Sequence, residues 1–130
     1  MRIFKNKWFQ RFARREGIDD SALRDAVERA EKGLIDADLG SGVLKQRIAR
    51  PGEGKSKGYR TIIFFRAGDR AVFVFGFPKS QTGNISDDEE KAFREAAKNV
   101  LSLPEEHLAA LIKRGDFVEV KKKDEQKVSK

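Results

Sequence analysis

The sequence predicts a single α+β domain, in which an antiparallel sheet carries an N-terminal helical hairpin and is followed by C-terminal helices. Three observations support this class. Residues 59–66 and 71–77 are rich in β-branched and aromatic side chains and are separated by a short turn, which predicts a β-hairpin. Apolar residues recur at helical spacing on both sides of this hairpin. The length of 130 residues fits one compact domain.

The N-terminal part predicts a short strand over residues 2–5 and then two helices. Asn6 can cap the first helix, and Asp19, Asp20 or Ser21 can begin the second, which Gly33 ends. Four residues form the apolar side of the first helix, where we expect Trp8 to lie in the core: Trp8, Phe9, Phe12 and Ala13. The apolar stripe of the second helix consists of Leu23, Ala26, Val27 and Ala30.

Residues 43–50 predict the next strand, which ends before Pro51. Its alternation places Lys45 and Arg47 on one face and Leu44 and Ile48 on the other. Residues 51–58 contain three glycines and no apolar residue, so we expect an exposed, mobile loop.

The C-terminal part predicts two helices separated by Pro104. Ser86 and Glu89 form a capping box for the first, and the second spans residues 105–114 and ends at Gly115. A short extended stretch follows over residues 117–120. We therefore expect the domain to span residues 1–120 and the Lys-rich segment 121–130 to be a disordered tail.

Composition excludes several kinds of site. The chain has no cysteine and one histidine, His107, which excludes thiol chemistry and disulfides and argues against a His triad or a multi-His metal site. The acidic residues 87–90 fit helix capping better than metal binding, and we expect neither a metal nor another cofactor. The longest apolar run, residues 61–65, cannot span a membrane, and residues 1–15 lack the apolar region of a signal peptide. We expect a cytoplasmic protein.

Charge is distributed unevenly along the chain, whose net charge is +7. Residues 1–15 carry six Lys/Arg and no acid, residues 16–42 carry three against eight acids, and residues 43–79 carry nine against two. The last of these segments also holds six aromatic residues, a composition suited to polyanion binding. A solvated basic sheet surface is the alternative, and charge alone does not separate the two.

The candidate functional residues gather if the strands form a meander. The end of one hairpin arm lies beside the start of the other, so Lys79 approaches the strand that begins with Tyr59 and Arg60. The resulting cationic cleft would also include Lys45, Arg47, Lys55 and Lys57. It could bind a phosphodiester, stabilise its pentavalent transition state and position a ribose 2′-hydroxyl for in-line attack, with Lys or Tyr transferring protons. Solvated loop lysines and a half-buried sheet Tyr59 are the structural alternatives.

Several separated blocks together resemble a known family. Those in the hairpin region are Gly58-Tyr59-Arg60-Thr61, Arg66, Gly68-Asp69-Arg70-Ala71 and Gly76-Phe77-Pro78-Lys79. Earlier blocks are Ile3-Phe4-Lys5, Trp8-Phe9, Phe12-Ala13, the run over residues 33–40 and the run over residues 45–52. From residue 1 to about residue 100, the chain resembles the HigB-like branch of the RelE/ParE toxin superfamily.

The resemblance implies a small toxin that a cognate antitoxin neutralises, with operator DNA as a possible ligand of the toxin–antitoxin complex. RelE-type members cleave mRNA in the ribosomal A site, using basic residues in place of a histidine pair. Carried over by position, Arg60 and Lys79 would stabilise phosphate and transition-state charge, Lys45 and Arg47 would position RNA and transfer protons, and Tyr59 would stack on a base. The RNA-binding set implied by the cleft and the resemblance is Lys55, Lys57, Tyr59 and Arg66.

Departures from the family pattern leave other functions open. RelE uses a tyrosine near its C-terminus, whereas this chain has Asn84 and Ile85 in that region and Tyr59 as its one tyrosine. Pro78 and Ser80 beside Lys79 also differ from the branch. ParE members share the fold but inhibit DNA gyrase, so a non-cleaving inhibitor of gyrase or of another protein is the main alternative. A nucleic-acid-binding module without toxicity is the third.

Overall fold

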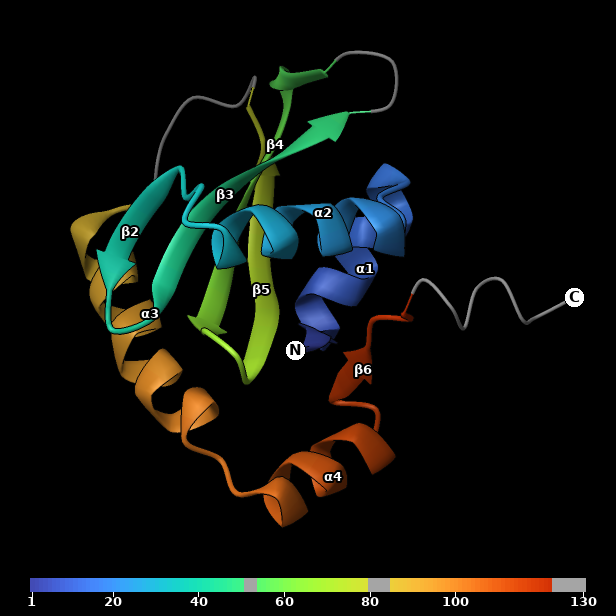
Figure 1. The fold of residues 1–130 in the computed structure, drawn as a ribbon, viewed down its shortest axis with the longest axis vertical. Coiled ribbons are helices and arrows are strands. Elements are labelled where there is room, and N and C mark those ends of the chain that lie inside the picture. The colour runs from blue at the N-terminus through green and yellow to red at the C-terminus, as the bar shows by residue number, and fades with distance from the viewer. Residues whose placement is uncertain (51–53, 80–84, 123–130) are drawn as a thin grey trace, which may run out of the picture.

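A computed structural model describes residues 1–50, 54–79 and 85–122 of the chain (Figure 1). The elements in chain order are β1 (Arg2–Asn6), α1 (Lys7–Glu16), α2 (Asp20–Glu31), β2 (Ala37–Gly40), β3 (Val43–Arg50), β4 (Gly54–Arg66), β5 (Arg70–Pro78), α3 (Asp87–Leu101), α4 (Glu105–Lys113) and β6 (Phe117–Glu119). The predicted α+β class is confirmed.

The strands form one sheet with the order β2-β3-β4-β5-β1-β6. All neighbouring strands are antiparallel except β1 and β5, which are parallel. The predicted hairpin is confirmed as β4 and β5, and Gly68 adopts a φ of 75° in the turn between them. Because β3, β4 and β5 are consecutive neighbours, the predicted meander is confirmed as well.

β4 begins five residues earlier than the sequence predicts. Residues 54–58 were expected to be loop, but they belong to β4, and Arg50 pairs with Gly54 across an irregularity in the β3–β4 ladder. A Cβ on Gly58 would lie 2.0 Å from the carbonyl oxygen of Ile48, so the two strands approach closely only because this residue is glycine. Residues 51–53, the rest of the predicted loop, lie outside the described residues.

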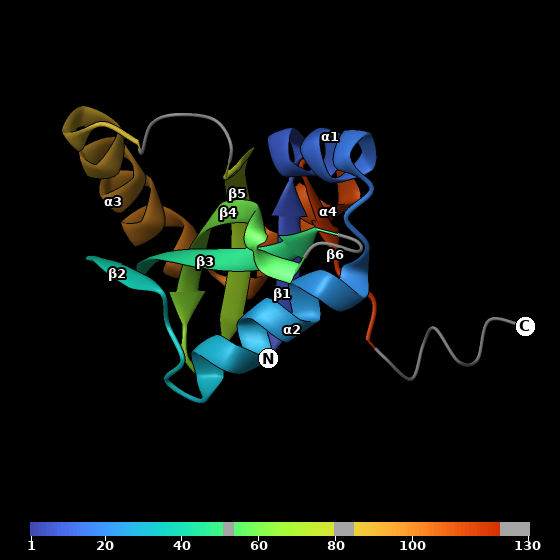
Figure 2. The same cartoon turned by 90° about the horizontal axis from the view of Figure 1, so that it is seen from above.

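The helix boundaries agree closely with the capping signals. The Asn6 side chain accepts a hydrogen bond from the Phe9 N–H, Asp19 caps α2, and Ser86 and Glu89 form the predicted capping box of α3. The expected hairpin of the first two helices is only partly present. α1 contacts β1, β5 and β6, whereas α2 contacts β3 across one face of the sheet (Figures 1 and 2).

Each face of the sheet has its own hydrophobic core. The core under α1 and α2 includes Phe12, Leu23, Ile48, Tyr59 and Phe73. The core on the opposite face includes Val43, Ile62, Phe77, Ala97 of α3 and Leu108 of α4. Burial on both faces explains why β4 and β5 are continuous apolar runs rather than alternating patterns.

The predicted tail begins with a residue that is tied to the domain. The N–H of Lys121 donates to Asp20 Oδ2 at 3.0 Å, and its carbonyl accepts a hydrogen bond from Arg24 at 2.6 Å. Residues 123–130, which complete the predicted tail, lie outside the described part of the chain. Among the described residues, no helix is both long and apolar enough to cross a membrane.

Candidate functional site

Three adjacent strands bring four predicted basic residues together. Arg47 of β3 lies directly opposite Arg60 of β4, which in turn lies opposite Phe77 of β5. Residues that pair directly across strands share a face, and Phe77 belongs to the core beneath α3, so both arginines lie on the α3 face. Lys45, two residues before Arg47, lies on the same face opposite Ile62.

Lys79 completes this group. Its N–H donates to the carbonyl of Gly58 at 2.9 Å, so Lys79 lies directly after β5 and beside the residue that precedes Tyr59. Its side chain is exposed. We call Lys45, Arg47, Arg60 and Lys79 the cationic row.

The two arginines of the cationic row differ in their partners. The Arg47 side chain is 42% exposed and its guanidinium lies 3.5 Å from the carboxylate of Asp36. Within the described ranges, the Arg60 side chain forms no hydrogen bond or ion pair with another residue, and it is only partly buried. Like charges directly opposite each other destabilise a sheet, so a bound anion between Arg47 and Arg60 would remove an unfavourable interaction.

Asp36 is a part of the site that sequence reasoning missed. It accepts the Arg47 N–H at 2.6 Å, and its own N–H donates to the buried Gln46 side chain at 2.8 Å. The Gln46 amide group also donates to the carbonyls of Ala26 and Leu34, which fixes this segment against α2. Asp36 therefore holds Arg47 and partly neutralises it. An open depression of about 510 Å³ includes this ion pair in its lining, together with Arg29 of α2 and residues 33–35.

The predicted base-stacking role of Tyr59 is wrong. Its side chain is 1% exposed, so no face of the ring is available to a base. Because Tyr59 precedes Arg60 in a strand, it lies on the opposite face of the sheet from the cationic row. There its ring contacts Phe12 edge-on at a centroid distance of 5.7 Å, and its hydroxyl donates to Glu16 Oε1 at 3.1 Å. Burial, followed by the Glu16 contact, raises the pKa of Tyr59.

Arg66 does not join the cationic row. It lies at the far end of β4, six residues or about 20 Å along the strand from Arg60. Its Nε donates to Asp69 Oδ2 at 2.9 Å, where it stabilises the turn before β5. The structure therefore places Arg66 apart from the cationic row, and its RNA contact stays a prediction. Lys55 and Lys57 belong to the first part of β4, which leads into Tyr59 and Arg60, and their RNA contacts stay a prediction.

Aromatic residues adjoin the cationic row from β5 and α1. Phe75 shares the α3 face with Phe77, and its ring centroid lies 4.5 Å from that of Trp8 and 5.9 Å from that of Phe93. Trp8 was predicted to lie in the core, but it is only partly buried and reaches Phe75 from the start of α1. The hairpin register already implies that Phe75 and Phe77 share a face with Arg60.

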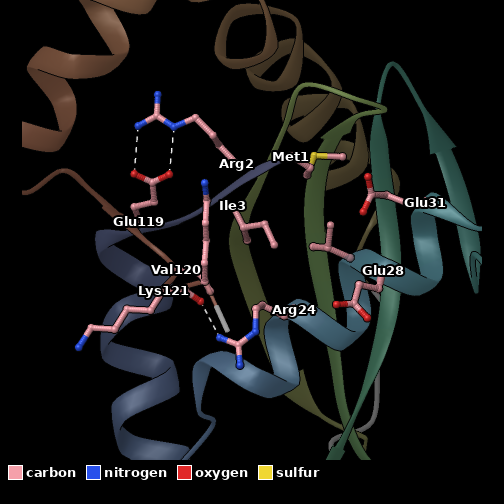
Figure 3. Close-up of a pocket in the computed structure, with 11 residues that line it drawn as sticks. Met1, Arg2, Ile3, Arg24, Glu28, Glu31, Glu119, Val120 and Lys121 are labelled. Carbon is pink, nitrogen blue, oxygen red and sulfur yellow. Dashed lines mark hydrogen bonds and ion pairs between the residues drawn. The ribbon is translucent and has the colours of Figure 1, made fainter. Parts of the chain in front are cut away.

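A separate cavity of about 210 Å³ lies between α2 and the chain segments at β1 and β6 (Figure 3). Arg2 and Glu119 form an ion pair at 3.0 Å on one side, and Arg24 holds the carbonyl of Lys121 on the other. None of the predicted site residues lines this cavity. In the residues that the structure describes, no three His, Cys, Asp or Glu side chains are grouped to hold a metal ion.

Comparison with known protein families matches residues 1–120 to one family, described as the RelE toxin of the RelE/RelB toxin–antitoxin system. The match spans all ten elements of the fold and includes the complete cationic row. It does not distinguish a HigB-like branch within the superfamily. No curated protein matches the chain.

Proposed function

Since the chain belongs to the RelE toxin family and is therefore a toxin of a toxin–antitoxin system, we propose that it acts as a ribosome-dependent endoribonuclease on translated mRNA. The cationic row would be the catalytic site. The assignment of the chain to a HigB-like branch is part of this proposal, because the sequence blocks that resemble this branch include Arg60 and Lys79.

The observation that carries the proposal is the direct pairing of Arg47 with Arg60, with Lys79 beside the same pair of strands. A guanidinium offers a planar array of donors that matches two phosphate oxygens. A strand scaffold also fixes the backbone positions of these side chains before substrate binds, which favours electrostatic stabilisation of a transition state.

The chemistry would be attack of a ribose 2′-hydroxyl on the adjacent phosphorus. The P–O2′ bond forms as the P–O5′ bond breaks, giving a cyclic phosphate and a 5′-hydroxyl product. Arg60 and Lys79 would stabilise the additional negative charge of the pentavalent phosphorus, and Arg47 would position the phosphate. Arginine does not deprotonate in proteins, so proton transfer falls to the two lysines. Lys45, as the neutral amine, would accept the proton of the attacking 2′-hydroxyl, and Lys79, as the ammonium, would donate a proton to the departing 5′-oxygen.

The family also implies an antitoxin partner. We propose that the antitoxin supplies acidic groups that cover the cationic row, and that the toxin–antitoxin complex can bind operator DNA. Neutralisation would then be competitive with RNA binding. Addition of antitoxin should raise the toxin concentration needed for half-maximal cleavage.

Mapping of mRNA 5′ ends by primer extension in a reconstituted translation reaction tests the nuclease function. Wild-type protein should create new ends at A-site codons, these ends should need ribosomes, and Arg60→Ala should remove them. Intact mRNA at protein concentrations that stop growth would instead indicate a non-cleaving inhibitor, and DNA gyrase supercoiling would be the next assay.

A further inference from the structure

An acidic side chain, Asp36, contacts the cationic row at the edge of the sheet. The segment that joins α2 to β2 runs alongside β3 and brings Asp36 to Arg47 (Figure 1). Asp36 Oδ2 accepts the Arg47 N–H at 2.6 Å, while Asp36 Oδ1 lies 3.5 Å from the Arg47 guanidinium. The two oxygens of one carboxylate therefore contact the backbone and the side chain of the same cationic residue.

A buried side chain fixes the position of Asp36. The fully buried Gln46 amide accepts the Asp36 N–H at 2.8 Å and donates to the carbonyl of Leu34 at 3.1 Å. It also donates to the carbonyl of Ala26 at 3.0 Å, which ties the segment to α2. A buried amide that lost these partners would carry a large desolvation cost, so the Asp36 carboxylate stays beside Arg47.

The fold uses the backbone and one carboxylate oxygen of Asp36, but it does not need the negative charge. Asparagine at this position could still accept the Arg47 N–H, and the Gln46 contact involves only the Asp36 backbone. The ion pair that the charge adds is open to water, because the Arg47 and Asp36 side chains are 42% and 25% exposed. Exposed ion pairs contribute little to stability, so the charge of Asp36 calls for a role other than stability.

The charge of Asp36 bears directly on how the cationic row can bind an anion. Asp36 occupies the guanidinium of Arg47, whereas the side chain of Arg60, directly opposite, has no hydrogen bond or ion pair within the described ranges. A phosphate that bridges the two arginines must therefore displace Asp36 from the Arg47 guanidinium. The depression of about 510 Å³ includes the ion pair in its lining, which leaves room for an approaching anion.

The contacts of Asp36 allow this exchange without a change in the backbone. The long Arg47 side chain can turn away while Asp36 Oδ2 keeps its hydrogen bond to the Arg47 N–H. Arg29 Nη1 lies 3.9 Å from the same carboxylate, so Asp36 retains a cation nearby after Arg47 has moved to a phosphate. Arg29 itself is held in place, because its Nη2 donates to the Arg47 carbonyl at 2.6 Å.

We propose that Asp36 is a positioning residue that competes with RNA phosphate for Arg47 and thereby lowers the affinity of the cationic row for free RNA. The choice of RNA as the ligand rests on the proposed function. A phosphate gains its contact with Arg47 only when the ion pair to Asp36 breaks, so single-stranded RNA in solution binds weakly. A ribosome presents mRNA at a high effective concentration, which offsets this cost. Asp36 therefore increases the dependence of the protein on ribosome-bound RNA.

The test measures the affinity for a short single-stranded RNA that carries a fluorescein label. All its 2′-hydroxyls are methylated, so that the RNA cannot be cleaved through 2′-hydroxyl attack. Fluorescence anisotropy over a range of salt concentrations compares the wild type with Asp36→Asn, Arg47→Gln and the double variant Asp36→Asn/Arg47→Gln. Thermal melting monitors the fold of each variant.

Asp38→Asn is the matched control. It removes the same charge two residues away, and asparagine can keep the hydrogen bond from the Gly40 N–H to this side chain. Asp38 pairs directly with Leu44, whose neighbour Lys45 belongs to the cationic row. Because directly paired residues share a face and successive strand residues alternate, Asp38 lies on the face opposite the cationic row. Its substitution should leave the RNA affinity within about twofold of the wild type.

Asp36→Asn should bind the RNA about fivefold more tightly at low salt, the equivalent of one exposed ion pair that no longer has to break. The slope of log affinity against log salt should steepen by about 0.7, for one additional phosphate contact on a single strand. In the Arg47→Gln background, the same substitution should change the affinity less than about twofold, because no Arg47 guanidinium remains to be released. Damage to the fold would weaken binding rather than strengthen it.

Three results would overturn the inference. They are unchanged or weaker RNA binding by Asp36→Asn, an equal gain in the Arg47→Gln background, and an equal gain in Asp38→Asn. Either of the last two would indicate general repulsion between acidic residues and RNA in place of competition for Arg47.

The proposed function and the inference can fail separately. An affinity gain in Asp36→Asn that depends on Arg47, in a protein whose wild type does not cleave mRNA on ribosomes, would refute the nuclease and retain the role of Asp36. Cleavage by the wild type together with unchanged RNA affinity in Asp36→Asn would retain the nuclease and refute that role.

Discussion

Replacement of Tyr59 by phenylalanine separates a structural role for this residue from a role in RNA binding. The ring is 1% exposed and lies across the sheet from Arg60, so Tyr59→Phe should leave the surface that faces RNA unchanged. The substitution removes only the hydroxyl, which donates to Glu16 Oε1 at 3.1 Å.

The expected cost follows from the contacts that the hydroxyl makes with Glu16, which are the hydrogen bond to Oε1 at 3.1 Å and a longer one to the carbonyl oxygen at 3.4 Å. A hydrogen bond to a charged group contributes about 1.5–3 kcal/mol when buried, and Glu16 is partly accessible to water, so we expect Tyr59→Phe to lower the free energy of unfolding by about 1–2 kcal/mol. Tyr59→Ala also removes the ring that contacts Phe12, and it should cost about 3–5 kcal/mol.

The pH dependence of stability gives a second readout. Burial raises the folded-state pKa of Tyr59 above the usual value of about 10, so the unfolded chain loses this proton first as pH rises. The contribution of Tyr59 to the free energy of unfolding is therefore complete below about pH 10 and is lost above it. Tyr59→Phe should therefore remove the part of the stability loss at alkaline pH that comes from Tyr59.

Urea unfolding from pH 7 to pH 11 measures both effects, and the ribosome cleavage assay measures activity at a temperature where each variant is folded. The expected result for Tyr59→Phe is lower stability with a cleavage rate within about twofold of the wild type. A cleavage rate reduced tenfold or more, with unchanged stability, would refute the structural assignment and would indicate that the Tyr59 hydroxyl takes part in the reaction.

Three further substitutions test the fold. Gly42→Ala should destabilise the protein by about 2–4 kcal/mol in thermal melting, because Gly42 has a φ of 84° and the new Cβ would lie 2.5 Å from Leu101 Cδ1. In urea unfolding below about pH 4.5, Glu119→Gln should lose less stability than the wild type. The Arg2 hydrogen bond lowers the folded-state pKa of Glu119, so the contribution of Glu119 to the free energy of unfolding is present only above that range. An unchanged acid profile would contradict this. Ser86→Ala should cost about 1 kcal/mol in urea unfolding through loss of the α3 cap, with faster amide exchange in the first turn.

The β4–β5 hairpin could be predicted because its two arms and its turn are local features of the sequence. The start of β4 could not, since residues 54–58 are polar and glycine-rich, and their strand conformation depends on pairing with β3. β2 was missed for the same reason. It has four residues, and its contacts are with β3 and α3 rather than within its own segment.

Alternation and hairpin geometry were sufficient to group Lys45, Arg47, Arg60 and Lys79. The error at Tyr59 was avoidable, because adjacent residues of a strand cannot both face the same ligand. Arg66 was grouped with the RNA-binding residues through the family resemblance, whereas distance along an extended strand separates it from Arg60. Asp36 could not be found, since its contact with Arg47 depends on how Gln46 anchors the preceding segment.

Comparison of Arg60→Gln with Arg66→Gln tests the central claim most directly. Both substitutions remove one guanidinium from β4, but only Arg60 belongs to the cationic row. Single-turnover mRNA cleavage is measured at saturating ribosomes, with thermal melting of both variants. We predict that Arg60→Gln slows cleavage at least 100-fold while Arg66→Gln stays within about threefold of the wild type, in line with the loss of one transition-state contact. Equal cleavage rates for the two variants would contradict the assignment of the cationic row as the catalytic site.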